Sequence, residues 1–161
     1  MQKKHTVSLL VDNEPGVLSR VTGLFSGRGF NIESLCVAET LDRSVSRITL
    51  VTRGDDAVAE QIKKQLNKLI NVIKVHDLTG LEYVEREMAL VKVQAKAESR
   101  PEILRIVDIF RCKVVDVSPT HYTIEVTGTA GKLAAILALL KPMGIKEIAR
   151  TGAIALGREK K

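Results

Sequence analysis

The sequence predicts an α+β protein built from two ferredoxin-like βαββαβ domains. Hydrophobic residues alternate along the chain between the spacing of strands and the spacing of amphipathic helices. The order strand, helix, strand, strand, helix, strand occurs once in the first half and is repeated in the second. A length of 161 residues with 45% hydrophobic content suits two small domains, each with its own core. Each sheet is expected to be antiparallel, with both helices on one face.

The first predicted domain covers residues 1–78 and holds the first set of six elements. A strand at 6–11 leads into a turn, and the helix after it presents an apolar stripe of Val17, Leu18, Val21, Leu24 and Phe25. Gly27 and Gly29 are expected to end that helix. The segments 32–40 and 44–52, rich in Val, Ile and Thr, predict a hairpin. A second helix from about Asp55 and a strand at 72–77 complete the domain.

The second predicted domain covers residues 79–161 and repeats the order. Strands are expected at 88–95, 113–117, 122–127 and 145–156, the last with an interruption near Thr151. Helices are expected at 101–110 and 132–140, and Pro142 with Gly144 ends the second one. The charged run at 82–87 is interpreted as a solvated linker between the domains.

Composition argues against several classes of function. The net charge is +6, but basic and acidic residues are interspersed along most of the chain. The chain has no Trp, three Phe and two Tyr, too few aromatic side chains for a platform that stacks single-stranded bases. No apolar run approaches the roughly 20 residues of a membrane span, and no signal peptide is recognisable. The expected location is the cytoplasm.

The residues that most often perform chemistry are isolated in this sequence. Cys36 and Cys112 are far apart and are interpreted as small buried apolar residues. His5, His76 and His121 lack a nearby nucleophile or metal-ligand spacing. No catalytic residue and no metal site is therefore predicted, because an enzyme would need a convergent acid–base pair.

A possible nucleotide loop is also discounted. Gly23, Gly27 and Gly29 fall within and after a helix, whereas the glycines of a dinucleotide-binding loop lie between a strand and a helix.

The segment 12–31 is the most informative part of the chain. Pro15 sets a turn, and Gly16 allows close backbone approach where the helix begins, so the free N–H groups of Gly16, Val17 and Leu18 can bind an anion. The helix dipole adds attraction for a carboxylate. The side chains of Asn13 and Asn31 can accept hydrogen bonds from an ammonium group. Together these groups suit a free α-amino acid, although the same residue types also occur in purely structural turns and caps.

The segment also resembles the ACT domain, in which the first strand runs into a D-x-P-G-x-L loop, a helix and a G-x-N-I segment. The residues in that arrangement are Asp12, Pro15, Gly16, Leu18, Gly29, Asn31 and Ile32. Longer blocks resemble the small regulatory subunit of acetohydroxyacid synthase, also called acetolactate synthase. They are NEPGVLSRVTGLFSGRGFNIESL (13–35), EQIKKQLNKLINVIKV (60–75), VEREMALVKV (84–93) and FRCKVVDV (110–117). The resemblance spans nearly the whole chain and is loosest near 97–99.

The resemblance implies a non-catalytic subunit without a cofactor of its own. Such subunits bind and activate a catalytic large subunit, for which thiamine diphosphate, Mg and FAD are expected, and confer feedback inhibition by a branched-chain amino acid, usually valine. The effector lies between two ACT domains of a homodimer. The positions implied as effector contacts are Asn13, Glu14, Pro15, Gly16, Val17, Leu18, Asn31 and Ile32. Positions implied less directly are Ser19, Ala38 and Gln61 for the effector or interface, with packing an equal alternative for Ala38, and Arg86 and Glu87 for the large subunit.

The predicted topology is compatible with a site at a dimer interface. In the ferredoxin-like order the second strand, 32–40, lies at a sheet edge, and an apolar edge strand favours pairing with its copy. An effector bound there would stabilise the dimer geometry that it bridges. The alternative function is a stand-alone amino-acid-responsive regulator, possibly of transcription. That alternative would need a helix-turn-helix or a concentrated basic face, and the sequence displays neither.

Overall fold

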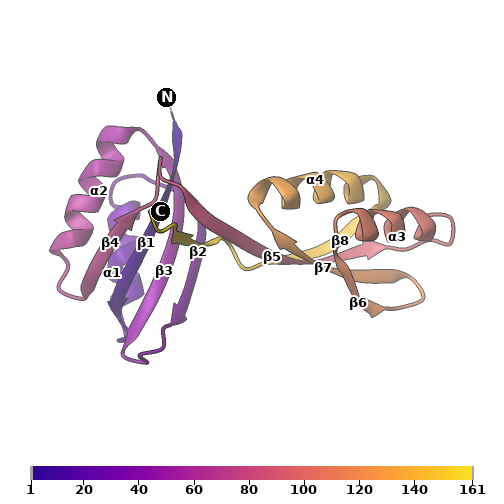
Figure 1. The fold of residues 1–161 in the computed structure, drawn as a ribbon, viewed down its shortest axis with the longest axis horizontal. Helices are drawn as coiled ribbons and strands as arrows, with labels where there is room; N and C mark the ends of the chain where they lie inside the picture. Colours follow the sequence, from indigo (N-terminus) through magenta and orange to yellow (C-terminus); the bar gives the residue numbers. More distant parts are fainter. Residues whose placement is uncertain (1, 161) are drawn as a thin grey trace. The chain divides into compact units, whose positions relative to one another are not determined.

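The computed structural model describes residues 2–160 and divides them into two compact units. The first unit runs to Val84 and also takes in the segment from Ala153 onward, whereas the second unit is Glu85–Gly152. Both units have the βαββαβ order, which confirms the predicted α+β fold with two ferredoxin-like units (Figure 1). A functional boundary after Leu78 stays a prediction. No helix among residues 2–160 is both long and apolar enough to cross a membrane.

The first unit is a four-stranded sheet with two helices on one face (Figure 1). Its elements are β1 (Lys3–Asp12), α1 (Val17–Ser26), β2 (Ile32–Glu39), β3 (Val45–Gly54), α2 (Asp56–Lys68) and β4 (Val72–Asp77). The strand order is β2-β3-β1-β4, and every pairing is antiparallel. The second strand therefore lies at an edge, as predicted.

The core of the first unit lies between this sheet and α1 and α2. Val17, Val21 and Phe25 of α1 are buried there, because positions four residues apart fall on one side of a helix. Leu18 belonged to the predicted stripe, but its side chain is 41% exposed. It therefore lies beside the core and is available at the start of α1.

The second face of this sheet carries small polar side chains. Thr6, Ser8 and Thr49 are buried although they point away from the helices. Other segments of the same unit hydrogen-bond to this face: the N–H of Thr6 donates to Thr79 Oγ1 at 3.1 Å, and the N–H of Ala153 donates to Ser34 Oγ at 3.1 Å. The end of the chain thus contributes to the first unit.

The second unit repeats the arrangement (Figure 1). Its elements are β5 (Tyr83–Gln94), α3 (Arg100–Ile109), β6 (Lys113–Val117), β7 (His121–Gly128), α4 (Ala130–Leu140), a short 3-10 helix (Lys141–Met143) and β8 (Ile145–Arg150). The strand order is β6-β7-β5-β8. The last strand of the chain, β9 (Ile154–Gly157), lies in the segment that belongs to the first unit. The predicted last strand is therefore two strands, separated close to the expected interruption at Thr151.

The charged run at 82–87 was predicted to be a solvated linker, and that prediction is wrong. The strand β5 already begins at Tyr83. Glu87 is buried, and its Oε1 lies 2.6 Å from Nε of Arg150. The ion pair compensates the buried carboxylate, so Glu87 belongs to a strand and not to a solvated linker.

Candidate functional site

The start of α1 differs from the starts of the other helices. Gly16 is the N-cap residue and adopts a left-handed conformation with φ of 86°, without a capping side chain. In α2 and α4 a side chain accepts a hydrogen bond from the first turn, from Val58 N to Asp55 and from Lys132 N to Thr129. The first turn of α3 holds the carboxylate of Glu102. Of the α-helices within residues 2–160, α1 alone has neither a capping side chain nor a carboxylate in its first turn. The positive end of its helix dipole is therefore uncompensated.

The backbone around Gly16 is open to solvent. The N–H of Val17 makes a long hydrogen bond of 3.4 Å to the carbonyl of Glu14. In the described part of the chain, no hydrogen bond has the N–H of Gly16 or Leu18 as its donor. A Cβ built on Gly16 would meet no atom within 4 Å. Two of the three predicted N–H groups are therefore free to bind an anion.

Asn13 is fixed in place by the hairpin that joins β2 and β3. Its N–H donates to the carbonyl of Ser44 at 2.8 Å, and its side-chain Nδ2 donates to the carbonyl of Arg43 at 2.8 Å and to Glu39 Oε1 at 3.4 Å. The carboxamide oxygen remains an acceptor. Asn13 thus lies beside the end of β2 with an oxygen that suits an ammonium group.

Asn31 lies at the opposite end of the sheet from Asn13. It directly precedes β2, and its backbone carbonyl accepts a hydrogen bond of 2.7 Å from Thr52 Oγ1. The other end of β3 is Val45, which pairs with Asp12. Thr52 and Val45 are therefore about 23 Å apart along β3, at roughly 3.3 Å per residue. One chain therefore does not bring the two asparagines together.

The remaining residues of the loop have different surroundings. Glu14 Oε2 lies 3.5 Å from the Nδ2 of Asn71, a residue that directly precedes β4, so the carboxylate is directed to the edge opposite β2. Pro15 is exposed and Val17 is buried, whereas Ile32 is half-buried against the core. Glu14 as an effector contact stays a prediction.

The secondary positions are not gathered around this loop. Ser19 is exposed in the first turn of α1. Ala38 is exposed on β2, on the sheet face opposite the core residue Leu35. Gln61 accepts a hydrogen bond of 2.8 Å from Arg28 in a groove between α1 and α2. Their roles at the effector site or interface stay predictions.

The two residues predicted to contact a partner also differ from each other. Arg86 is exposed and donates to the carbonyl of Glu85 at 2.6 Å. Glu87 is buried and paired with Arg150 within the second unit. Arg86 is thus accessible to a partner, whereas Glu87 already has a structural role.

One residue near the site was missed by the sequence reasoning. The backbone carbonyl of Asn71 accepts from the N–H of Asp12 at 2.8 Å, and its Nδ2 donates to Asp12 Oδ2 at 3.2 Å. Its Oδ1 accepts from the guanidinium of Arg20. Asn71 therefore ties the loop before α1 to the loop before β4. No local pattern reveals this role, because its partners lie more than 50 residues away in the chain.

The histidines and cysteines have ordinary surroundings. Nε2 of the buried His5 lies 3.2 Å from the carbonyl of Gly54, and His121 Nδ1 lies 2.8 Å from Thr120 Oγ1. Both cysteines are free thiols that are half-buried, less buried than predicted, and burial raises the pKa of the Cys112 thiol. Within residues 2–160, no group of three or more His, Cys, Asp or Glu side chains is placed to hold a metal ion.

Comparisons with known proteins connect both halves of the chain to one family. A family model described as an AHAS small subunit-like ACT domain matches residues 7–74, and a model of the small subunit of acetolactate synthase matches residues 86–159. The chain is 54% identical over 158 residues to the acetolactate synthase small subunit of Aquifex aeolicus, covering 98% of this chain and 82% of the relative. It is 53% identical over 156 residues to the corresponding protein of Mycobacterium bovis, covering 97% of this chain and 93% of the relative.

A solved structure agrees with these relatives. The crystal structure of the acetolactate synthase small subunit from Thermotoga maritima matches with a TM-score of 0.91 and 45% identity, covering 99% of each chain. The family models, the relatives and this structure extend over both units of the molecule. The chain therefore belongs to the family of acetolactate synthase small subunits.

Proposed function

We propose that the chain is the regulatory subunit of acetohydroxyacid synthase, acting in branched-chain amino acid biosynthesis in the cytoplasm. It binds and activates the catalytic large subunit and makes that subunit sensitive to feedback inhibition by valine. Thiamine diphosphate, Mg and FAD belong to the large subunit, and this chain contributes regulation without a catalytic residue. The names of its relatives support the regulatory role.

The uncompensated start of α1 carries the proposal for the effector site. The carboxylate of valine accepts hydrogen bonds from the N–H groups of Gly16 and Leu18, where the helix dipole favours negative charge. Its ammonium group donates to the side-chain oxygens of Asn13 and Asn31. The exposed side chain of Leu18 and the half-buried Ile32 offer apolar surface to the isopropyl group.

A homodimer through β2 completes this site. If two copies of β2 pair antiparallel across a twofold axis, the start of one strand lies beside the end of the other. Asn31 precedes that start, and Asn13 is hydrogen-bonded to Glu39 at that end. The two asparagines that lie far apart in one chain then come together from two chains. The exposed edge of β2, where Val37 is 42% exposed, favours the pairing.

The experiment combines ligand binding with activation. Isothermal titration calorimetry is expected to show valine binding with one site for each twofold-related loop, and mixing the chain with the purified large subunit is expected to raise its turnover. An absence of heat with valine, leucine and isoleucine would remove the sensor role. Valine binding without any change in large-subunit turnover would instead favour the stand-alone amino-acid-responsive regulator.

A further inference from the structure

A pocket lies beside the start of α1, on the side of the first unit that carries β4. Its volume is about 530 Å³. The residues that line it come from α1, from the end of α2 and from the loop before β4, and they are Val17, Arg20, Lys68, Leu69, Ile70, Asn71 and Val72. In the strand order, β4 is at the edge opposite β2, so the pocket is distinct from the edge proposed for dimerisation.

The pocket has an apolar floor that continues onto the surface. Val17 is buried, and Leu69 and Val72 pack against the core of the first unit. Ile70 also lines the pocket, but its side chain is 96% exposed. A small molecule in the pocket would leave most of Ile70 in water, whereas a protein segment lying across the pocket would cover it.

The charged residues that line the pocket indicate which kind of protein segment would bind there. The pocket's two charged residues, Arg20 and Lys68, are both cations. Neither forms a salt bridge with any residue in the part of the chain that the structure describes. An occupant that presents a carboxylate beside apolar side chains matches both the floor and these cations.

The pocket is connected to the loop proposed to bind the effector. Asn71 lines the pocket, accepts from Arg20, and holds Asp12 through its backbone carbonyl and its side-chain amide. Val17 lines the pocket and directly follows Gly16. A displacement of the loop before α1 would therefore move two residues of the pocket: Asn71, which is hydrogen-bonded to Asp12, and Val17, which is joined to Gly16 by a peptide bond.

We infer that this pocket receives an acidic, apolar segment of the catalytic large subunit, and that Asn71 couples its occupancy to the effector loop. The identity of the partner rests on the proposed function. Because coupling between two sites is reciprocal, bound large subunit changes the affinity for valine by the same factor by which valine changes the affinity for the large subunit. Asn71 is a positioning residue in this arrangement, because it acts on the effector loop through its hydrogen bonds to Asp12 and Arg20 and does not itself bind valine.

The docking site is tested with two substitutions and two matched controls. Ile70→Asp and Lys68→Glu are each expected to raise the concentration of chain that half-activates the large subunit by about tenfold or more, as for loss of a central interface contact. Ile109→Asp alters an isoleucine that is 68% exposed in the second unit, and Lys64→Glu alters an exposed lysine one turn earlier on α2. Both controls are expected to activate like the wild type.

The outcomes separate the docking site from the proposed function. If the wild type activates the large subunit and both pocket variants do so at the same concentration, the docking site is refuted while the regulatory role stands. Equal losses in Ile70→Asp and Ile109→Asp would also refute it, because the pocket would not be special. If the wild type itself has no effect on the large subunit, the proposed function fails first. Melting temperatures unchanged from the wild type would exclude misfolding of the variants.

The coupling is tested with Asn71→Ala. In the wild type, saturating large subunit is expected to change the dissociation constant of valine several-fold, and in the variant the ratio of the two constants is expected to fall to about one. The free variant is expected to bind valine within about twofold of the wild type. If the ratio is unchanged, Asn71 does not transmit the signal. If valine affinity of the free variant is lost as well, Asn71 only maintains the shape of the loop, and the coupling role is refuted.

Discussion

The two units of the molecule are alike in backbone and different in the few residues that could bind an effector. In the first sheet the register shifts between Leu10 and Val11, and in the second sheet it shifts at the corresponding step, between Lys92 and Val93. The edge strands each contain a shift as well, between Ile32 and Ser34 in β2 and between Val114 and Asp116 in β6, but these shifts face different steps of the neighbouring strands. The matching shift in β1 and β5, together with the common strand order, indicates that the units are repeats of one structure.

The ends of the first helices also coincide. The residue after α1 with positive φ is Gly29, whose N–H donates to the carbonyl of Ser26 at 3.1 Å. The equivalent residue after α3 is Arg111, with φ of 54° and an N–H that donates to Asp108 at 3.2 Å. A left-handed arginine is less favourable than a glycine by roughly 1–2 kcal/mol, yet the turn is kept.

The starts of the same helices are where the units differ. α1 begins at the left-handed Gly16, whereas α3 begins at Ser99 with φ of −92° and has Glu102 in its first turn. The residue that directly precedes the edge strand is Asn31 in the first unit and Cys112 in the second. A carboxylate in the first turn opposes a bound anion, and a cysteine thiol is a weaker hydrogen-bond acceptor than a carboxamide oxygen. The first unit therefore matches the proposed amino-acid site better than the second, and the shared fold by itself does not decide function.

The largest expected effect comes from a substitution that removes this difference between the helix starts. Gly16→Asp places a carboxylate where the effector carboxylate is proposed to bind, and we expect the affinity for valine to fall by about a hundredfold or more because like charges repel at short range. Valine inhibition should disappear while activation of the large subunit is retained. The measurement is calorimetry together with a turnover assay.

Two controls make that result specific. Ser99→Asp introduces the same side chain at the start of α3 and should leave valine binding intact. Gly80→Asp places it at another glycine with positive φ, 77°, and with no atom near its Cβ, so it reproduces the backbone strain. Retained valine sensitivity in Gly16→Asp, or equal losses in the three variants, would contradict the site.

A smaller effect is expected at the glycines that end the third strand of each unit, because their neighbours differ. Gly54 ends β3 and Gly128 ends β7. A Cβ at Gly54 would lie 1.9 Å from the ring of Phe30, whereas at Gly128 it would lie 2.5 Å from Cδ of Lys132, a flexible chain. Gly54→Ala is expected to lower the free energy of unfolding by about 2 kcal/mol, because overpacking a core usually costs 1–3 kcal/mol.

Gly128→Ala is the matched variant in the second unit, with an expected loss of roughly 0.5 kcal/mol or less because the side chain of Lys132 can move aside. Hydrogen exchange of the core amides of each unit separates the two effects. Equal losses in both units would show that the ring of Phe30 yields as easily as a lysine.

The elements of the fold were largely predictable because each has a local pattern. The limits of β4 and β6 are those predicted, since alternating apolar residues define short strands. The start of β5 was missed because its charged residues resemble a linker, and the burial of Glu87 depends on Arg150, 63 residues later. Leu18 was counted in the apolar stripe, but as a neighbour of Val17 it lies a quarter turn away from the core.

The candidate site was predictable where it is local and hidden where it is not. The turn at Pro15 and Gly16 follows from residue types that favour tight turns, and the positive φ of Gly16 agrees with it. The tie from Asn71 to Asp12 and the hairpin contacts of Asn13 join segments distant in the chain. Such contacts depend on the packing of the whole unit, so the sequence alone does not reveal them.

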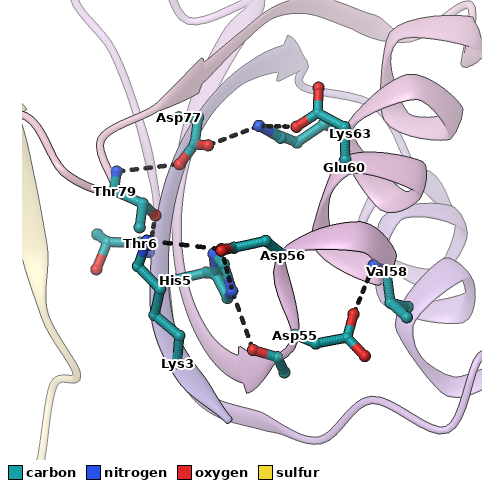
Figure 2. A network of polar contacts seen from close by, with 11 residues as sticks. Lys3, His5, Thr6, Asp55, Asp56, Val58, Glu60, Lys63, Asp77 and Thr79 are labelled. Carbon is teal, nitrogen blue, oxygen red and sulfur yellow. Dashed lines mark hydrogen bonds and ion pairs between the residues drawn. The ribbon is translucent and has the colours of Figure 1, made fainter. Parts of the chain in front are cut away.

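The smallest expected effect concerns two ion pairs at matching positions of β4 and β8. The strand supplies the anion of the pair in one unit and the cation in the other. Asp77 pairs in register with Val7, and Arg150 with Ala89, so a carboxylate in one unit corresponds to a guanidinium in the other. Figure 2 shows Asp77 beside Lys63, with Oδ2 2.7 Å from Nζ. Burial alone would raise the pKa of the Asp77 carboxyl, but hydrogen bonds from Lys63 and Thr79 outweigh it and lower that pKa below the ordinary value of 3.8.

The lowered pKa determines how the stability of the first unit responds to acid. Because the folded form holds the proton less tightly than the unfolded form, the contribution of Asp77 is present above pH 3.8 and is lost as the pH falls through the lower folded value. We expect Asp77→Asn to reduce the free energy of unfolding by roughly 1 kcal/mol at pH 7, and by progressively less as the pH falls through the lowered pKa of Asp77. Urea unfolding at pH 7 and at pH 2, in a double-mutant cycle with Lys63→Met, measures the pair. A difference that stays the same from pH 7 to pH 2 would mean that Asp77 acts through packing and not through its charge.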